Sequence, residues 1–192
     1  AVDTAIQLLG AKGYAKDKDW CVYKLTVPDV PPETYKKIYE RQMKRGTYEI
    51  LEFKNRREIK PWVRPILALM NECYMAENIY GYAPLEEQEM DDLARRFLPI
   101  LDPRFVKAIR KDGEVIAFII AMPDMTEGIV KARGRLLPFG FIRVLRAARK
   151  TKQLDLLLGA IREKYRGQGL TALMGIKVLL AASEAGMKVI DT

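Results

Sequence analysis

The 192-residue sequence contains no histidine and only two cysteines, Cys21 and Cys73. Without histidine the chain cannot build a Ser-His-Asp or Cys-His catalytic centre, or a histidine-ligated metal site. Two cysteines so far apart do not make a disulfide framework or a zinc site. We therefore expect free thiols, no bound metal and a reducing, cytoplasmic location.

A signal peptide and long apolar runs are also missing. Lys177 interrupts the best candidate for a membrane-spanning run, which would need about 20 apolar residues. The length leaves room for one ordinary domain, or one domain with an appendage. The net charge of +8 favours anionic partners, namely phosphorylated cofactors, acidic proteins, anionic lipids or nucleic acid.

Consecutive prolines mark a boundary near the N-terminus. Residues 27–32 read Val-Pro-Asp-Val-Pro-Pro, which disfavours both helix and strand. The preceding pattern predicts a helix over 1–12 and a strand over 20–27, too little to form a core alone. We therefore expect residues 1–30 to be a remnant of a preceding unit plus a linker, and residues 31–192 to form the main domain.

The main domain is predicted to alternate between helices and strands. Asp112-Gly113 is a strong two-residue hairpin signal, and residues 123–153 form a basic insert of two short helices around a proline break. The helix that begins at Pro84 should bury a stripe of Met90, Leu93, Phe97, Ile100 and Leu101. Further helices are predicted over 33–45, 57–79 and 170–185, and strands over 48–53, 105–110, 114–122, 154–158 and 187–191.

A basic loop with two glycines joins an apolar strand to a helix over residues 160–172. Free N–H groups and the positive end of a helix bind anions, phosphate above all. Gly167 and Gly169 allow a ligand to approach the main chain closely. Arg162, Lys164 and Arg166 add positive charge, so the segment predicts a diphosphate-binding turn.

The order of elements and this loop resemble the GNAT-type N-acyltransferases. The segment Arg162-Glu163-Lys164-Tyr165-Arg166-Gly167-Gln168-Gly169-Leu170 is similar to their acyl-CoA signature, Gln/Arg-x-x-Gly-x-Gly/Ala, with Lys164 at the Gln/Arg position. The resemblance implies an α/β (α+β) fold with a mixed, mainly antiparallel central sheet flanked by helices. Two features depart from the family: the insert at 123–153, and the absence of later elements after Thr192. We therefore expect a domain that is incomplete at its C-terminal side.

The resemblance also implies a cofactor, acetyl-CoA or another acyl-CoA, and acyl transfer from coenzyme A or a carrier thioester to a small-molecule or peptide amine. The turn would hold the diphosphate, while the backbone of Ala160 and Ile161 would pair with the pantetheine arm. The implied cofactor-binding residues are Ala160, Ile161, Arg162, Lys164, Tyr165, Arg166, Gly167, Gln168, Gly169, Leu170 and Thr171.

Asp155 is the candidate catalytic base, because the attacking amine must lose a proton. Strand alternation predicts that Asp155 shares a face with Leu157 and Gly159, where burial would raise its pKa. Solvent exposure at the start of the strand is the alternative. Tyr80 and Tyr82 are candidates for the acceptor side by the same resemblance, and packing explains them equally well.

Other interpretations of the loop stay open. Residues 167–172 also fit the dinucleotide pattern G-x-G-x-x-A, with Asp191 near the position of the ribose-binding acid. Against this, five residues separate the strand from Gly167, where that fold turns at once. A non-catalytic GNAT-like binding module and a basic helix entry without any ligand are the remaining alternatives.

The insert suggests a docking surface over residues 131–152. Its second predicted helix is amphipathic, with basic and apolar residues on one segment, which could dock an acidic carrier protein or an anionic membrane. A helix packed on its own domain with a solvated basic face is the alternative. Motifs for nucleic-acid recognition are not evident. The residues concerned are Lys131, Arg133, Arg135, Phe141, Ile142, Arg143, Leu145, Arg146, Ala148, Arg149 and Lys150.

Overall fold

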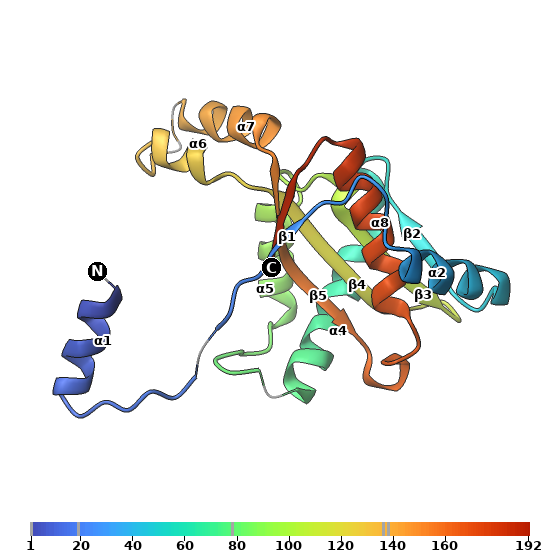
Figure 1. The fold of residues 1–192 in the computed structure, drawn as a ribbon, viewed down its shortest axis with the longest axis horizontal. Coiled ribbons are helices and arrows are strands. Elements are labelled where there is room, and N and C mark those ends of the chain that lie inside the picture. The colour runs from blue at the N-terminus through green and yellow to red at the C-terminus, as the bar shows by residue number, and fades with distance from the viewer. Residues whose placement is uncertain (1, 19, 78, 136, 138) are drawn as a thin grey trace.

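A six-stranded sheet in the order β1-β6-β5-β4-β3-β2 forms the centre of the fold (Figure 1). The computed structural model describes residues 2–18, 20–77, 79–135, 137 and 139–192. All neighbouring strands are antiparallel except β5 and β6, which are parallel. This confirms the mixed, mainly antiparallel sheet. The strands are β1 (Lys24–Thr26), β2 (Glu49–Glu52), β3 (Val106–Lys111), β4 (Glu114–Pro123), β5 (Gln153–Ile161) and β6 (Val189–Asp191).

Helices cover both faces of the sheet (Figure 1). On one face Leu173 of α8 packs with Ile109 and Ile116, and α2 packs on α8. On the other face Ile66 of α4 packs with Phe118. The helices are α1 (Val2–Ala11), α2 (Glu33–Arg45), α3 (Arg56–Ile59), α4 (Val63–Ala76), α5 (Glu87–Phe97), α6 (Thr126–Lys131), α7 (Gly140–Lys150) and α8 (Leu170–Glu184).

The hairpin between β3 and β4 forms where the sequence predicts it. Asp112 and Gly113 have φ values of 51° and 84°. A type I′ turn requires positive φ at both central residues, which Asp-Gly tolerates. The hairpin therefore places two largely buried strands side by side in the middle of the sheet.

The helix predicted over 57–79 is divided, which corrects that prediction. It consists of α3, a 3₁₀ turn at Lys60–Trp62 and α4. Pro61 has no N–H for an α-helical hydrogen bond, and the chain tightens around it. Helix α4 ends at Ala76, and residue 78 of the predicted range lies outside the described residues.

The buried stripe predicted for the next helix is also wrong in part. Helix α5 begins at Glu87, after a capping box between Glu86 and Glu89. Leu101 is buried, but Phe97 is 43% exposed and Ile100 38% exposed. Helix α5 has no fully buried residue, because a cavity lies between it and the sheet.

The basic insert is a hairpin of two short helices, as predicted, and projects from the end of the sheet between β4 and β5 (Figure 1). The helices approach closely at Gly128, where a Cβ atom would lie 2.5 Å from the Val144 Cα. Leu137 and Phe139, between the helices, are exposed. Residues 136 and 138 lie outside the described residues.

The N-terminal segment contributes one strand to the sheet. Strand β1 is shorter than predicted; it pairs with β6, and Val27 is buried beside it. The described side chains of α1 are exposed, including Ile6 and Leu8. The division at residues 30 and 31 stays a prediction. None of the described helices has the length and apolar character that a membrane span requires.

Candidate functional site

The edge of β5 that faces β6 is open along most of its length. Strand β6 pairs only with Gln153, Leu154 and Asp155, whereas β4 pairs with the other edge up to Ile161. Residues 156–161 have no strand partner on this side among the described residues. An unpaired edge offers N–H and C=O groups to an extended ligand, as an added strand would use them.

The groups that face this open edge belong to Gly159 and Ile161. The Arg162 N–H donates to the Ile116 carbonyl of β4, and main-chain groups alternate between edges along an antiparallel strand. The main chain of Ala160 therefore faces β4. The resemblance implied that Ala160 and Ile161 pair with the pantetheine arm. The main chain of Ile161 faces the open edge, as does that of Gly159, whereas that of Ala160 does not.

The glycine turn follows directly. Gly167 and Gly169 have φ values of 72° and 85°, and a Cβ atom on Gly169 would lie 2.8 Å from the Ile38 Cγ2. Within the described part of the chain, no acceptor bonds the N–H groups of residues 167–172. These donors stand at the positive end of the 15-residue helix α8, an arrangement that favours an anion.

Two residues distant in sequence hold the turn in place. Gln42 of α2 is buried and its Nε2 donates to the Gln168 carbonyl over 2.6 Å. The Tyr48 hydroxyl donates to the Gln168 Oε1, also over 2.6 Å. The Gln168 Nε2 in turn donates to the Lys164 carbonyl. These bonds use the Gln168 side chain and carbonyl, and they leave the main-chain donors of the turn free.

The predicted cations of the loop are mostly paired within the protein. The Arg162 guanidinium bonds to Glu72 and Glu114, and Arg166 pairs with Glu77. Lys164 has no carboxylate partner among the described residues; its Nζ lies 5.0 Å from the Tyr165 ring centroid. The sequence does not reveal these acidic partners, because they come from two other elements: α4 with its C-cap residue Glu77, and β4.

Sequence reasoning missed three other cations beside the turn. Arg41 and Arg45 of α2 and Lys111 of β3 line a surface hollow of about 410 Å³ together with Gly167 and Gln168. Neither arginine has an acidic partner among the described residues. Their i,i+4 spacing, which places both on one helix face, is the signal that could have identified them.

Asp155 lies where β6 separates from β5. Its Oδ1 accepts a hydrogen bond of 2.8 Å from the Gln153 Nε2, which also donates to Asp191 over 3.2 Å. Burial raises the pKa of Asp155 above its usual value. The hydrogen bond from Gln153 opposes that rise, and the carboxylates of Asp124 and Asp191 add to it.

A β-bulge changes which residues share the face of Asp155. The pairing with β4 shifts register between Leu156 and Leu158, so Leu157 is the extra residue. Asp155 and Leu157 share a face, as predicted. The prediction is wrong for Gly159, because Leu158 takes that face after the bulge and Gly159 lies on the other.

The candidate acceptor tyrosines lie on the loop after α4. Tyr80 is exposed, whereas the Tyr82 hydroxyl donates to Asn71 and its ring packs edge-on against Tyr74. The Tyr74 hydroxyl donates to the Gly159 carbonyl over 3.3 Å, at the open edge of β5. Burial raises the pKa of Tyr74 above its usual value. Tyr74 was missed because its place in a helical pattern indicates only packing.

Comparison with solved structures identifies the fold. A GCN5-related N-acetyltransferase from Sphaerobacter thermophilus superimposes with a TM-score of 0.62 at 12% identity, over 98% of this chain and 46% of that chain. The C-terminal domain of a protein assigned as a lysylphosphatidylglycerol synthetase from Agrobacterium fabrum gives 0.53 at 13%, over 89% and 45%. The chain therefore has a GNAT-type fold, which confirms the resemblance seen in the sequence.

Comparison of the sequence with known proteins identifies one relative. No protein-family model matches the sequence. The bacterial ceramide synthase of Caulobacter vibrioides (strain NA1000 / CB15N) is 29% identical over 136 residues, which cover 70% of this chain and 34% of the relative. The chain thus spans about a third of the length of this relative and less than half of the two structures above.

Proposed function

We propose that this chain is an acyltransferase domain that moves an acyl group from coenzyme A, or a carrier thioester, to an amine. One observation carries the proposal: the open edge of β5 leads directly into the unbonded N–H groups of residues 167–172. One continuous surface thus serves an extended pantetheine arm and a diphosphate. The GNAT-type fold supports this proposal, as does the similarity to a ceramide synthase, since a ceramide contains an amide.

In this proposal acetyl-CoA or another acyl-CoA binds with its diphosphate on the glycine turn. Lys164, Arg41 and Arg45 supply positive charge around the main-chain donors. Gly159 and Ile161 offer their outward N–H groups to the carbonyls of the pantetheine arm. Their own carbonyls already accept hydrogen bonds from Tyr74 and Arg166. Tyr80 and Tyr82 remain the proposed residues of the acceptor side.

The proposed reaction forms a C–N bond and breaks the C–S bond of the thioester. Asp155 takes one proton from the acceptor ammonium, so that the neutral nitrogen can attack the carbonyl carbon. Tyr74 gives its proton to the leaving thiolate. A second proton leaves the nitrogen as the amide forms and restores Tyr74. The raised pKa of Asp155 brings this base closer to neutral pH.

A non-catalytic module with the same turn is the competing function, and calorimetry followed by turnover assays separates the two. We expect the purified protein to bind coenzyme A and not NAD. We expect Asp155→Asn to retain coenzyme A binding and to lose turnover. Unchanged turnover in Asp155→Asn would remove Asp155 from the mechanism, and absence of coenzyme A binding would contradict the proposed function.

We also propose that the hairpin of α6 and α7 docks on an anionic membrane surface. Leu137, Phe139 and Phe141 are 82%, 70% and 46% exposed, and α7 carries four basic residues between Arg143 and Lys150. Exposed aromatic and leucine side chains beside cations are typical of helices that lie in a membrane interface.

We also propose a cytoplasmic location, with which the free thiols of Cys21 and Cys73 are consistent.

Vesicle sedimentation tests this docking surface. We expect binding to vesicles that contain phosphatidylglycerol, weakened at high salt and by Phe139→Ser, with Phe97→Ser as the control outside the hairpin. Binding to an acidic carrier protein in place of vesicles would support the other partner class. Equal binding by Phe139→Ser and the unmodified protein would contradict a membrane contact through the hairpin.

A further inference from the structure

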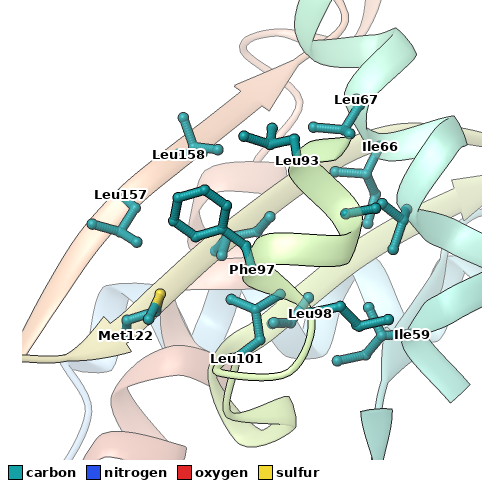
Figure 2. A pocket seen from close by; sticks show the side chains of 14 residues that line it. Ile59, Ile66, Leu67, Leu93, Phe97, Leu98, Leu101, Met122, Leu157 and Leu158 are labelled. Atoms are coloured by element: carbon teal, nitrogen blue, oxygen red, sulfur yellow. The ribbon is translucent and has the colours of Figure 1, made fainter. Parts of the chain in front are cut away.

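An apolar cavity of about 260 Å³ lies between α4, α5 and the sheet (Figure 2). Its walls include Leu93 and Phe97 of α5, Met122 of β4, and Leu157 and Leu158 of β5. All the described side chains that line it are apolar. Protein interiors contain few voids larger than a water molecule, so a cavity of this size and composition favours an apolar ligand.

The cavity has an exposed mouth and a buried floor. Phe97 and Leu157, which are 43% and 48% exposed, stand at the mouth. Ile59 and Val106 are 1% and 0% exposed and form the floor. Figure 2 shows Phe97 pointing from α5 toward the β5 side chains, with Ile59 on the far side of the space. A linear ligand would enter beside Leu157 and run inward under α5.

The mouth adjoins the proposed reaction centre. Leu157 is the bulge residue of β5. It lies on the same face of the strand as Asp155, which precedes it by two residues. The open edge of β5 begins at the neighbouring Leu156. The bulge turns both Leu157 and Leu158 toward the cavity, so that the strand offers main-chain groups at its edge and an apolar surface on its face.

We propose that this cavity takes the aliphatic chain of the acyl donor, so that the substrate is a medium- or long-chain acyl thioester. This inference rests on the proposed function, since it places the thioester beside Leu157 and Asp155. An apolar cavity of about 150 Å³ holds a benzene molecule. By the same measure the cavity here has room for roughly ten carbon atoms.

Calorimetric titration with acetyl-, hexanoyl- and decanoyl-CoA tests the inference. Each methylene group that leaves water should tighten binding about fourfold until the cavity is filled. Equal affinity for the three donors would overturn the inference and leave the proposed function intact. Failure of all three donors and of coenzyme A to bind would overturn the proposed function itself.

A variant that fills the cavity tests whether the acyl chain of the donor binds there. Ala94 lines the cavity from α5, and Ala94→Leu should reduce the preference for decanoyl-CoA over acetyl-CoA by about tenfold or more. Gln88→Leu adds the same side chain to an exposed position of the same helix and should leave the preference unchanged. Phe97→Ala, which removes one wall of the mouth, should also weaken decanoyl-CoA selectively. An unchanged preference in both cavity variants would contradict this location.

Discussion

The two faces of the sheet are built differently. Helix α8 buries Leu170, Leu173 and Met174 in direct contact with the strands, whereas α5 has no fully buried residue and stands off the sheet. The packed face supports the glycine turn at the start of α8. On the other face, side chains packed less tightly under α5 leave the cavity in which the acyl chain is proposed to bind. The loose packing is confined to the α5 side of that face, because α4 on the same face buries Ile66, Leu69 and Met70 against the strands. The variants below compare the packed α8 side with the hollow under α5.

Asp155→Asn should have the largest effect on activity. Loss of a general base lowers kcat by about 10²–10⁴-fold. In the unmodified protein we expect kcat/KM to rise with pH through the raised pKa of Asp155, and Asp155→Asn should lose this limb. If the residual activity of Asp155→Asn still rises with pH over the same range, the pH dependence belongs to a group other than Asp155.

Although Asp155→Asn should lose activity, its stability at neutral pH should not fall. A carboxyl group with a raised pKa binds more protons folded than unfolded, so its contribution to stability falls as pH rises from the unfolded to the folded pKa. At neutral pH the ionised group therefore destabilises the fold. The thermal midpoint of Asp155→Asn at pH 7 should be equal to or higher than that of the unmodified protein, whereas a large decrease would indicate a structural role.

Leu173→Ala and Leu93→Ala compare the two faces directly. Leu173 is 0% exposed on the packed face, and its truncation should cost about 2–5 kcal/mol of unfolding free energy. Leu93 lines the existing cavity, so its truncation should cost about 1 kcal/mol, below the usual range for a packed leucine. Chemical denaturation measures both values. Equal losses would contradict the difference in packing.

Tyr74→Phe tests the proton donor on the hollow face. Removal of the hydroxyl should lower kcat by about ten- to a hundredfold and leave KM nearly unchanged, because the ring still packs against Tyr82. Tyr14→Phe, at an exposed position to which no role is assigned, serves as the control. Steady-state kinetics with equal kcat values for the two variants would exclude Tyr74 as the acid.

Glu52→Gln tests the ionic contacts at the border of the packed face. Glu52 bonds to Lys177 of α8 and to the buried Lys107. Burial alone would raise the pKa of Glu52, but hydrogen bonds from both lysines outweigh it and lower the pKa below 4.5. Its stabilising contribution is therefore present above pH 4.5 and is lost as pH falls through the folded pKa.

Because Glu52 is partly exposed, Glu52→Gln should cost about 1–3 kcal/mol at pH 7. The difference from the unmodified protein should shrink as the pH falls below 4.5. Denaturation curves at several pH values measure both effects. A difference that does not vary with pH would show that the lost contacts are not ionic.

Arg41→Gln with Arg45→Gln should have the smallest effect. The two cations lie beside the turn and contribute long-range attraction to an anionic cofactor. Their loss should weaken coenzyme A binding by about three- to tenfold at low salt, and less at high salt. Lys36→Gln with Lys37→Gln, elsewhere on the same helix, is the matched control. Equal weakening by the control pair would leave only net charge as the cause.

Local patterns predicted much of the fold. Asp112-Gly113 fixed the hairpin, and the apolar strand followed by Gly167 and Gly169 predicted the turn and its free donors. The rest depends on contacts that are remote in sequence. Gln42 reaches Gln168 across 126 residues, and the acidic partners of Arg162 lie on two other elements. The bulge at Leu157 breaks a simple alternation, and no periodicity reveals it.

The central claim is that the main-chain N–H groups of residues 167–172 bind the diphosphate of coenzyme A. Nuclear magnetic resonance of the ¹⁵N-labelled protein during titration with coenzyme A tests it residue by residue. The amide signals of Gly167, Gly169 and Leu170 should shift strongly and saturably, while those of Gly113 and Gly186 stay in place. Binding of coenzyme A that leaves the turn signals unmoved would contradict the claim.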